Sequence, residues 1–292
     1  MSTLTDPYRT RAGGGVQLLQ RQDPVLHGGR GASPDGVVSA AQVEGYERDG
    51  YLSLPSFFSG EELADLAGER DRLLSDPSLR GRPELIVEPQ SQAIRSIFAV
   101  HRSSPVYSQL AVHPRLLDVA RHLLGSDVYI HQSRINYKPG FVGKEFYWHS
   151  DFETWHSEDG MPRMRALSCS ISLTENNEHN GPLMVMPGSH RTFVNCPGET
   201  PEDNFKQSLR RQEAGTPDPA SLEKLAAEGG IVSAKGPAGS VLFFECNLMH
   251  GSSSNISPWP RSNIFLVFNS VENRLRDPFC GRAARPDYIA SR

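Results

Sequence analysis

The feature that most constrains this chain is His149-Ser150-Asp151, because it sets two metal-binding side chains at strand spacing. On an extended backbone, residues two apart point to the same side of the strand. The imidazole of His149 and the carboxylate of Asp151 can therefore reach one metal ion from one strand end. A third ligand must come from elsewhere, and His250 fits because it ends an apolar strand pattern and precedes Gly251. The fold must then bring two distant strand ends together.

Two histidines and one carboxylate leave open coordination positions on Fe(II) for an oxidant and a cosubstrate. We therefore predict that His149, Asp151 and His250 bind Fe(II) and form the catalytic centre. An isolated histidine is more often a core or surface residue than a ligand. His156 and His190 lie in segments with turn character, so we expect structural roles for both.

From Val128 onward, the hydrophobic pattern changes from helical to a period of two. One parity of 128–138 carries consecutive polar side chains, at Gln132, Arg134, Asn136 and Lys138. In 165–173, one parity is apolar and the other is small and mostly hydroxylated, at Ala166, Ser168, Ser170 and Ser172. The polar parity of 128–138 and the hydroxylated parity of 165–173 suit neither a dry core nor a solvent face. Both strands are therefore predicted to line a polar ligand cavity with these rows of side chains.

The remaining patterns predict a mostly β fold with flanking helices and a jelly-roll core, that is, a cupin-like double-stranded β-helix. Residues 1–37 are rich in glycine and polar groups, and we expect them to be a flexible lead-in. Capping-box spacings at Ser39 and Ser59 begin two helices, and a third helix ends at Gly125. Residues 38–292 should form one domain, in which 193–230 interrupt the strands as a surface excursion. Further strands are expected at 50–55, 182–186, 231–234, 240–250 and 262–269.

Composition narrows the partners. The net charge is -4 with no basic block, which argues against nucleic acid. No apolar run approaches the roughly 18 residues of a membrane span. The first residues lack the apolar segment of a secretory signal, and the four cysteines form no C-x-x-C pair. We therefore expect free thiols and a cytoplasmic protein with no membrane partner.

The run from Phe146 to Ser168 resembles the ectoine hydroxylases, a group in the phytanoyl-CoA dioxygenase-like branch of the Fe(II)/2-oxoglutarate oxygenases. Met186 to His190 and the tail from Pro278 to Tyr288 resemble them as well, and the likeness covers roughly residues 40–290. In such oxygenases an arginine at about the spacing of Arg261 from His250 binds the far carboxylate of 2-oxoglutarate. A guanidinium fork suits a planar carboxylate.

The resemblance implies a role for each candidate residue. Iron is expected at His149, Asp151 and His250. The expected 2-oxoglutarate residues are Lys138, Asn136, Phe146, Ser168, Ser170, Ser252 and Arg261. The expected ectoine residues are Gln132, Trp155, Ala166, Phe244, Phe265 and Arg282. The group also suggests a homodimer.

The implied reaction hydroxylates ectoine, a compatible solute, to 5-hydroxyectoine. Dioxygen and 2-oxoglutarate are the cosubstrates, and succinate and carbon dioxide leave. Two alternatives stay open: a related dioxygenase acting on another small amino or imino acid, and a non-catalytic jelly roll that binds a metal and a carboxylate. A ferrous halogenase fits less well, because Asp151 occupies the position that halide needs.

Overall fold

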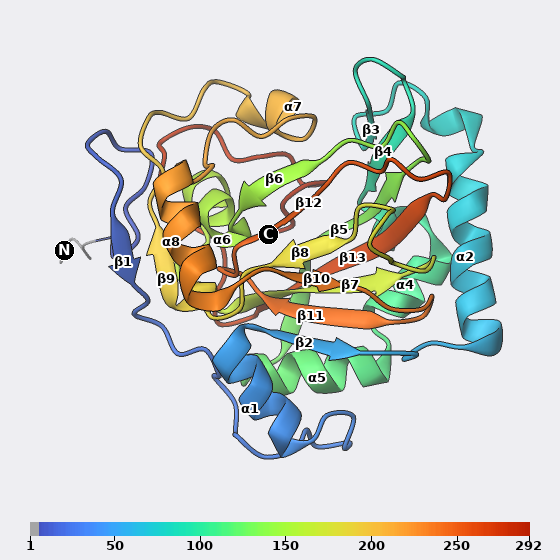
Figure 1. The fold of residues 1–292 in the computed structure, drawn as a ribbon, viewed down its shortest axis with the longest axis horizontal. Helices are drawn as coiled ribbons and strands as arrows, with labels where there is room; N and C mark the ends of the chain where they lie inside the picture. Colours follow the sequence, from blue (N-terminus) through green and yellow to red (C-terminus); the bar gives the residue numbers. More distant parts are fainter. Residues whose placement is uncertain (1–5) are drawn as a thin grey trace.

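The computed structural model describes residues 6–292 and contains two antiparallel sheets that form a jelly roll (Figure 1). The large sheet has the order β2 (Tyr51–Leu54), β11 (Val241–Glu245), β7 (Ala166–Ser172), β13 (Arg261–Ser270), β5 (Val128–Lys138), β4 (Ile94–Phe98) and β3 (Leu85–Val87). The smaller sheet has the order β10 (Val232–Ala234), β8 (Leu183–Val185), β12 (His250–Ser252) and β6 (Phe146–His149). The predicted fold class is confirmed.

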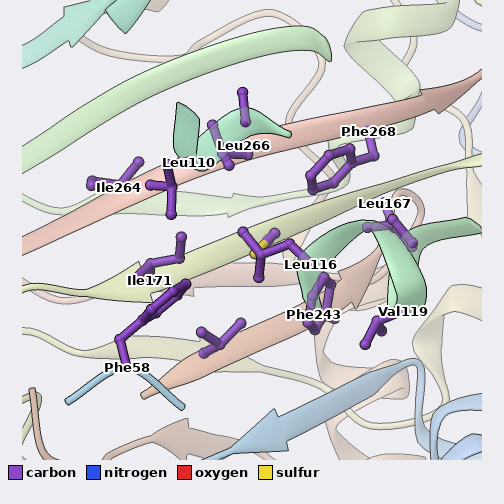
Figure 2. Packing of buried hydrophobic residues seen from close by; sticks show 14 of the residues in the cluster. Phe58, Leu110, Leu116, Val119, Leu167, Ile171, Phe243, Ile264, Leu266 and Phe268 are labelled. Carbon is purple, nitrogen blue, oxygen red and sulfur yellow. The ribbon is translucent and has the colours of Figure 1, made fainter. Parts of the chain in front are cut away.

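Helices cover the outer face of the large sheet. They are α1 (Ala40–Asp49), α2 (Gly60–Leu74), α3 (Val100–Ser103), α4 (Pro105–Ala111) and α5 (Pro114–Leu124), with a 3-10 turn η1 at Pro77–Leu79. Figure 2 shows Leu116 and Val119 of α5 beside Leu167 of β7 and Phe243 of β11. One parity of each strand is therefore used for the apolar core, which leaves the opposite parity to face the small sheet.

The polar row of β5 is interrupted by a β-bulge. The pairing with β13 runs from Lys138 to Gln132, and its register shifts between Val267 and Phe268, so that Phe268 lies opposite Ile130. The extra residue, His131, is turned away from its regular position. Val128 and Ile130 then pack against the helix-covered core, although strict alternation had grouped them with Gln132.

The apolar segment 240–250 is two strands, not the one predicted. β11 ends at Glu245 in the large sheet, a turn follows, and β12 begins at His250 in the small sheet. Glu245 stabilises the turn by accepting hydrogen bonds from the Asn247 backbone at 2.6 Å and from Cys246 Sγ at 3.0 Å. The change of sheet places His250 opposite β6.

The prediction of a flexible lead-in is wrong for residues 6–37, because this segment lies against the jelly roll. Tyr8 is fully buried, and β1 (Leu18–Gln20) pairs with β9 (Thr192–Val194) at the start of the predicted excursion. Such pairing is invisible locally because both strands have only three residues. Residues 1–5 of the predicted lead-in lie outside the described part of the chain.

The other local predictions have mixed outcomes. The capping box at Ser39 forms with Gln42, but Ser59 makes no side-chain cap. The excursion contains α7 (Asn204–Ser208) and α8 (Pro219–Gly229), and Asp218 caps the latter. All four cysteines are free. Within residues 6–292, no helix combines the length and the apolar character needed to cross a membrane.

Candidate metal centre

The three predicted ligands meet at one point. His149 is the last residue of β6, and Asp151 opens the short helix α6 (Asp151–Thr154) after an extended Ser150. His250 opens β12 and is the cross-strand partner of His149. The Nε2 atoms of the two histidines each lie 3.8 Å from a carboxylate oxygen of Asp151, and the three ligand atoms lie within 4.8 Å of one another.

Hydrogen bonds aim both imidazoles at this point. Nδ1 of His149 lies 2.6 Å from the Tyr147 carbonyl oxygen, and Nδ1 of His250 lies 2.9 Å from that of Leu248. A carbonyl only accepts, so each Nδ1 carries the proton and each Nε2 keeps its lone pair for a metal. The set of two imidazoles and one carboxylate fits Fe(II).

Electrostatics keep the ligands in their metal-binding forms. Burial and the neighbouring His250 lower the pKa of His149 to about 4, so its ring is neutral near pH 7. Burial alone would raise the pKa of Asp151, but His250, His149 and Arg134 lower it by more, and Ser168 donates a hydrogen bond at 3.1 Å. The carboxylate is therefore ionised.

The inward row of β5 forms consecutive layers with β13. Lys138 lies opposite Arg261, Asn136 opposite Asn263, Arg134 opposite Phe265, and Gln132 opposite Val267. Strand residues rise about 3.3 Å each, so the row extends roughly 20 Å from Lys138 to Gln132. Facing residues of β7 continue the layers: Ser170 lies opposite Phe265, and Ser168 opposite Val267.

One end of the row holds two buried cations. Arg261 is 1% exposed and donates Nη1 to the Gly181 carbonyl at 2.6 Å, while its buried Nε has no partner among the described residues. Lys138 is also 1% exposed and donates to Ser252 Oγ at 2.7 Å and to the Ser253 carbonyl. Neither forms a salt bridge within residues 6–292. Buried cations without acids fit an anionic ligand such as 2-oxoglutarate.

Among the remaining residues predicted for 2-oxoglutarate, Phe146, Asn136 and Ser252 lie around these cations. Ser170 and Ser168 lie farther along the row, in the layers of Arg134 and Gln132. The Phe146 ring lies 5.3 Å from Lys138 Nζ and 3.7 Å from the guanidinium carbon of Arg95. Asn136 accepts a hydrogen bond from Ser96 at 2.8 Å, and Asn263 donates to Ser170 at 3.0 Å. Burial, Arg261 and Arg95 hold the pKa of Lys138 well below its usual range.

The other end of the row combines polar and aromatic groups. Gln132 donates to the Ile289 carbonyl at 2.8 Å and accepts from Arg134. The Arg134 guanidinium carbon lies 4.7 Å from the Phe265 ring centroid. Phe244 lies 4.9 Å from the His250 ring and 6.5 Å from Phe265, centroid to centroid. This end connects directly to the metal ligands.

Trp155 and Ala166 belong to a neighbouring apolar cluster that includes Phe152 and Phe193. Trp155 begins a π-helical turn, η2 (Trp155–Asp159), directly after α6. His131, displaced by the bulge, packs edge-on against Trp155 with 5.3 Å between ring centroids. Its Nε2 lies 3.1 Å from Asp159.

The tail folds back onto the site, but Arg282 is not its most buried arginine. Arg282 is exposed and donates to the Thr200 carbonyl at 3.0 Å. Arg285 is 8% exposed and forms a two-point salt bridge with Asp159 at 2.7 and 2.6 Å. Phe279 stacks on His156 at 3.9 Å, which gives His156 the expected structural role.

His190 likewise lies away from the metal ligands. It begins no strand but belongs to the 3-10 turn η3 (Ser189–Arg191), and its Nε2 lies 3.3 Å from the Glu47 carbonyl. The three-ligand group His149, Asp151 and His250 is the only such metal-binding cluster found within the described residues.

A cavity of about 910 Å³ opens at His149 and leads to solvent. Its walls come from three separate segments: residues 88–95, residues 141–149, and residues 208–216 of the excursion. Arg95, which is buried, and Phe146 are among its lining residues. This cavity gives small molecules a route to the metal ligands.

Sequence reasoning missed three contributors. Arg134 stood in the polar row but had no assigned role. Ile289 contributes a backbone carbonyl, which no side-chain motif reveals. Arg285 differs from its neighbour Arg282 only through a buried acidic partner, Asp159. Only Arg134 had a usable signal in the sequence, because it lies on the same parity as Gln132 and Asn136.

Comparison with known proteins shows which family this chain resembles along its whole length. Residues 46–263 match the phytanoyl-CoA dioxygenase (PhyH) family. The ectoine dioxygenase of Bordetella bronchiseptica is 58% identical over 292 residues, covering 100% of this chain and 94% of the relative. The crystal structure of EctD from S. alaskensis with 2-oxoglutarate and 5-hydroxyectoine has a TM-score of 0.88 at 50% identity. It covers 98% of this chain and 95% of its own.

The structure of the same S. alaskensis protein with bound Fe also superposes, with a TM-score of 0.86. More distant neighbours, such as AviO1 from Streptomyces viridochromogenes at 22% identity and a TM-score of 0.61, share the fold alone. The family match and the full-length relatives agree with a jelly roll that presents two histidines and one aspartate to a metal. This chain belongs to the phytanoyl-CoA dioxygenase family.

Proposed function

We propose that this protein is an Fe(II)- and 2-oxoglutarate-dependent dioxygenase that hydroxylates ectoine to 5-hydroxyectoine and releases succinate and carbon dioxide. The observation that carries the proposal is the full-length likeness to EctD from S. alaskensis, whose structure contains both 2-oxoglutarate and 5-hydroxyectoine. The group His149, Asp151 and His250 fits a metal ion, and Arg261, whose buried Nε has no partner among residues 6–292, fits an anionic cosubstrate.

We assign the metal to His149, Asp151 and His250. Fe(II) bound there supplies the redox chemistry that links dioxygen to 2-oxo acid decarboxylation and substrate hydroxylation. Around it, the protein fixes the ligand geometry through the carbonyls of Tyr147 and Leu248.

We assign 2-oxoglutarate to the end of the row that holds Arg261 and Lys138. The guanidinium is proposed to bind the far carboxylate, because a two-point, charge-assisted contact fixes orientation as well as affinity. The other proposed lining residues are Asn136, Phe146 and Ser252 at this end, together with Ser170 and Ser168, which lie where the row approaches the metal ligands. Their hydroxyl and amide groups offer hydrogen bonds within a largely dry pocket.

We assign ectoine to the opposite end of the row. Ectoine is a small zwitterion with a cyclic amidinium and a carboxylate. Its cation can lie against an aromatic face, an attraction of about 0.5–2 kcal/mol. Its carboxylate can pair with Arg134, which has no acidic hydrogen-bond partner among residues 6–292. The proposed lining residues are Gln132, Trp155, Ala166, Phe244 and Phe265. Arg282 is exposed and donates to the Thr200 carbonyl, so it would have to turn inward to join them.

The deciding experiment incubates the protein anaerobically with Fe(II) and 2-oxoglutarate, admits air with ectoine, and follows the products by mass spectrometry. We expect ectoine to gain one oxygen and an equal amount of succinate to form. Succinate without a modified ectoine would favour another small amino or imino acid. Binding of 2-oxoglutarate without any succinate would favour a carboxylate-binding jelly roll.

We further propose that the protein works as a cytoplasmic homodimer without nucleic-acid or membrane partners, and that residues 38–292 act as one domain to which residues 6–37 contribute β1 and the buried Tyr8. The absence of a basic block argues against a nucleic-acid partner. The dimer rests on the resemblance to the ectoine dioxygenases alone. Light scattering on a gel-filtration column measures the mass in solution. A mass equal to one chain would refute the dimer.

A further inference from the structure

Arg11 lies beneath the turn that follows Asp151, far from Asp151 in the chain. Its side chain donates Nε and Nη2 to the carboxylate of Glu153 at 3.0 and 2.7 Å. Nη2 also donates to Thr154 Oγ1 at 3.1 Å, and Nη1 donates to Glu158. The Arg11 and Glu153 side chains are each 1% exposed. One guanidinium therefore connects both ends of the segment 153–158.

This segment contains the first turn after a metal ligand and the π-helical turn that begins at Trp155. Glu153 precedes Trp155 by two residues, and Glu158 follows it by three. A π-helical turn is rare and needs support from its surroundings. Arg11 supplies that support from outside the jelly roll, because it fixes residues on both sides of Trp155.

The same ion group also holds the excursion. We call residues 200–216 the cover segment, because residues 208–216 line the cavity that opens at His149. Arg11 Nη1 lies 3.3 Å from Thr200 Oγ1, and Asn204 Nδ2 donates to Glu158 at 2.7 Å. The backbone of Gly215 passes so close that a Cβ there would clash with Glu153 and with Arg11.

The junction between the cover segment and residues 153–158 depends on the positive charge of Arg11. Burial alone would lower the pKa of Arg11, but Glu153 and Glu158 outweigh burial and raise it above its usual value. Without the cation, the buried carboxylates of Glu153 and Glu158 would lose the one salt-bridge partner that each has within residues 6–292. Breaking a buried ion pair from one side is strongly destabilising, whereas an exposed pair contributes little. The junction holds its geometry only while Arg11 is present.

We propose that Arg11 is a positioning residue that couples the cover segment to the turn bearing Asp151 and Trp155. It acts through Glu153, Thr154 and Glu158 and touches no reacting group. Its guanidinium sets the depth of Trp155 and the closure of the cavity together. The activity readouts rest on the proposed ectoine hydroxylation, but the structural readout below does not.

The first test compares Arg11→Met and Arg11→Lys with the wild type. In Arg11→Met we expect the ectoine KM to rise at least roughly tenfold, as for a lost positioning contact, with a small change in 2-oxoglutarate KM. Succinate should exceed hydroxyectoine, because the cavity is less well closed. In Arg11→Lys, the amount of hydroxyectoine formed per succinate should be only partly restored, since an ammonium lacks the planar fork of a guanidinium.

Hydrogen–deuterium exchange on the metal-free protein provides the readout that does not need activity. Arg11→Met should exchange faster in both 151–159 and 200–216, while β13 stays unchanged. Arg163→Met is the matched control. Arg163 also forms a salt bridge with the N-terminal segment, at Asp23, but its side chain is 63% exposed. This control should keep the wild-type hydrogen exchange in 151–159 and 200–216, and the wild-type yield of hydroxyectoine per succinate.

Gly215→Ala covers the case in which Arg11→Met does not fold. It keeps every charged group but pushes the cover segment away from Arg11 and Glu153. The same two regions should exchange faster, and coupling should fall. The proposal is overturned if faster exchange in Arg11→Met stays within residues 6–23, or if Gly215→Ala keeps wild-type exchange in 151–159. If the wild type does not hydroxylate ectoine but the variants still exchange faster in both 151–159 and 200–216, only the proposed ectoine hydroxylation is refuted.

Discussion

His250 lies directly opposite His149 across the β6–β12 pair, with 4.3 Å between the ring centroids. Strand pairing thus sets the separation of two ligands that are far apart in the chain. Asp151 completes the group from the first turn of α6, and no loop has to close to form it. Strand pairing and the first turn of α6 are therefore enough to bring the three ligands together.

We predict that His149→Ala, Asp151→Ala and His250→Ala each abolish turnover, because a facial set that loses one ligand binds Fe(II) weakly. Iron content after anaerobic loading is the direct measurement. His179→Ala is the control, because that exposed histidine lies outside the ligand group. Full iron occupancy in Asp151→Ala would count against the assignment.

Arg261→Ala should raise the 2-oxoglutarate requirement hundreds-fold or more, since a buried carboxylate that loses its charged partner costs roughly 3–5 kcal/mol. The ectoine requirement should change far less. Arg261→Lys should recover only part of the loss, because one ammonium cannot reproduce the two-point contact. Separate titration of the two substrates decides the matter. Equal effects on both would make Arg261 a structural residue.

Lys138 should make 2-oxoglutarate binding sensitive to alkaline pH. Burial, Arg261 and Arg95 lower its pKa, and Glu145 and Glu88 offset this only in part. The folded protein then loses this proton at a lower pH than the unfolded chain does. Without cosubstrate, its stability should therefore rise with pH between the lowered pKa and the usual value of about 10.4.

A bound dianion favours the charged form of Lys138, so binding takes up a proton once the free amine is neutral. The 2-oxoglutarate Kd should therefore increase as pH rises above the lowered pKa of Lys138. Lys138→Met should bind more weakly and show a flatter pH profile below the range in which Arg261 titrates. An unchanged profile in Lys138→Met would mean that another group controls it.

Trp155→Ala should weaken ectoine use while Fe(II) and 2-oxoglutarate binding survive. Trp155 is 2% exposed, and removal of such a side chain typically costs 3–5 kcal/mol of stability. Trp155→Phe is therefore measured beside it, because it keeps an aromatic ring in the cluster. The ratio of succinate to hydroxyectoine should rise in both variants, and more in the alanine variant. Wild-type coupling in Trp155→Ala would remove Trp155 from the site.

Truncation after Asp287 should uncouple the reaction without unfolding the tail. The shortened protein keeps Arg285 on Asp159 but loses the Ile289 carbonyl that accepts a hydrogen bond from Gln132. Ectoine KM should rise, and 2-oxoglutarate should be decarboxylated in excess. Arg292→Ala is the control, since that residue is exposed. Unchanged ectoine affinity in the truncated protein would exclude the last residues from the site.

Sequence by itself determined what depends on neighbouring residues. The spacing of His149 and Asp151 placed both on one side of an extended backbone, and the structure retains that geometry across Ser150. Two-residue periodicity marked the inward rows of β5 and β7, because a strand has one side-chain direction per parity. The Ser39 cap and the helix end at Gly125 were also readable, since caps are local hydrogen-bond arrangements.

Tertiary structure alone decided what depends on strand register and on contacts between distant segments. It split 240–250 between two sheets, and the bulge turned His131 toward Trp155. It also buried Arg11 and Arg285 against acidic partners, although an arginine in a polar segment is usually exposed. Periodicity reports which residues share a face, but pairing energy and burial of charge depend on what lies opposite, which the local sequence does not contain.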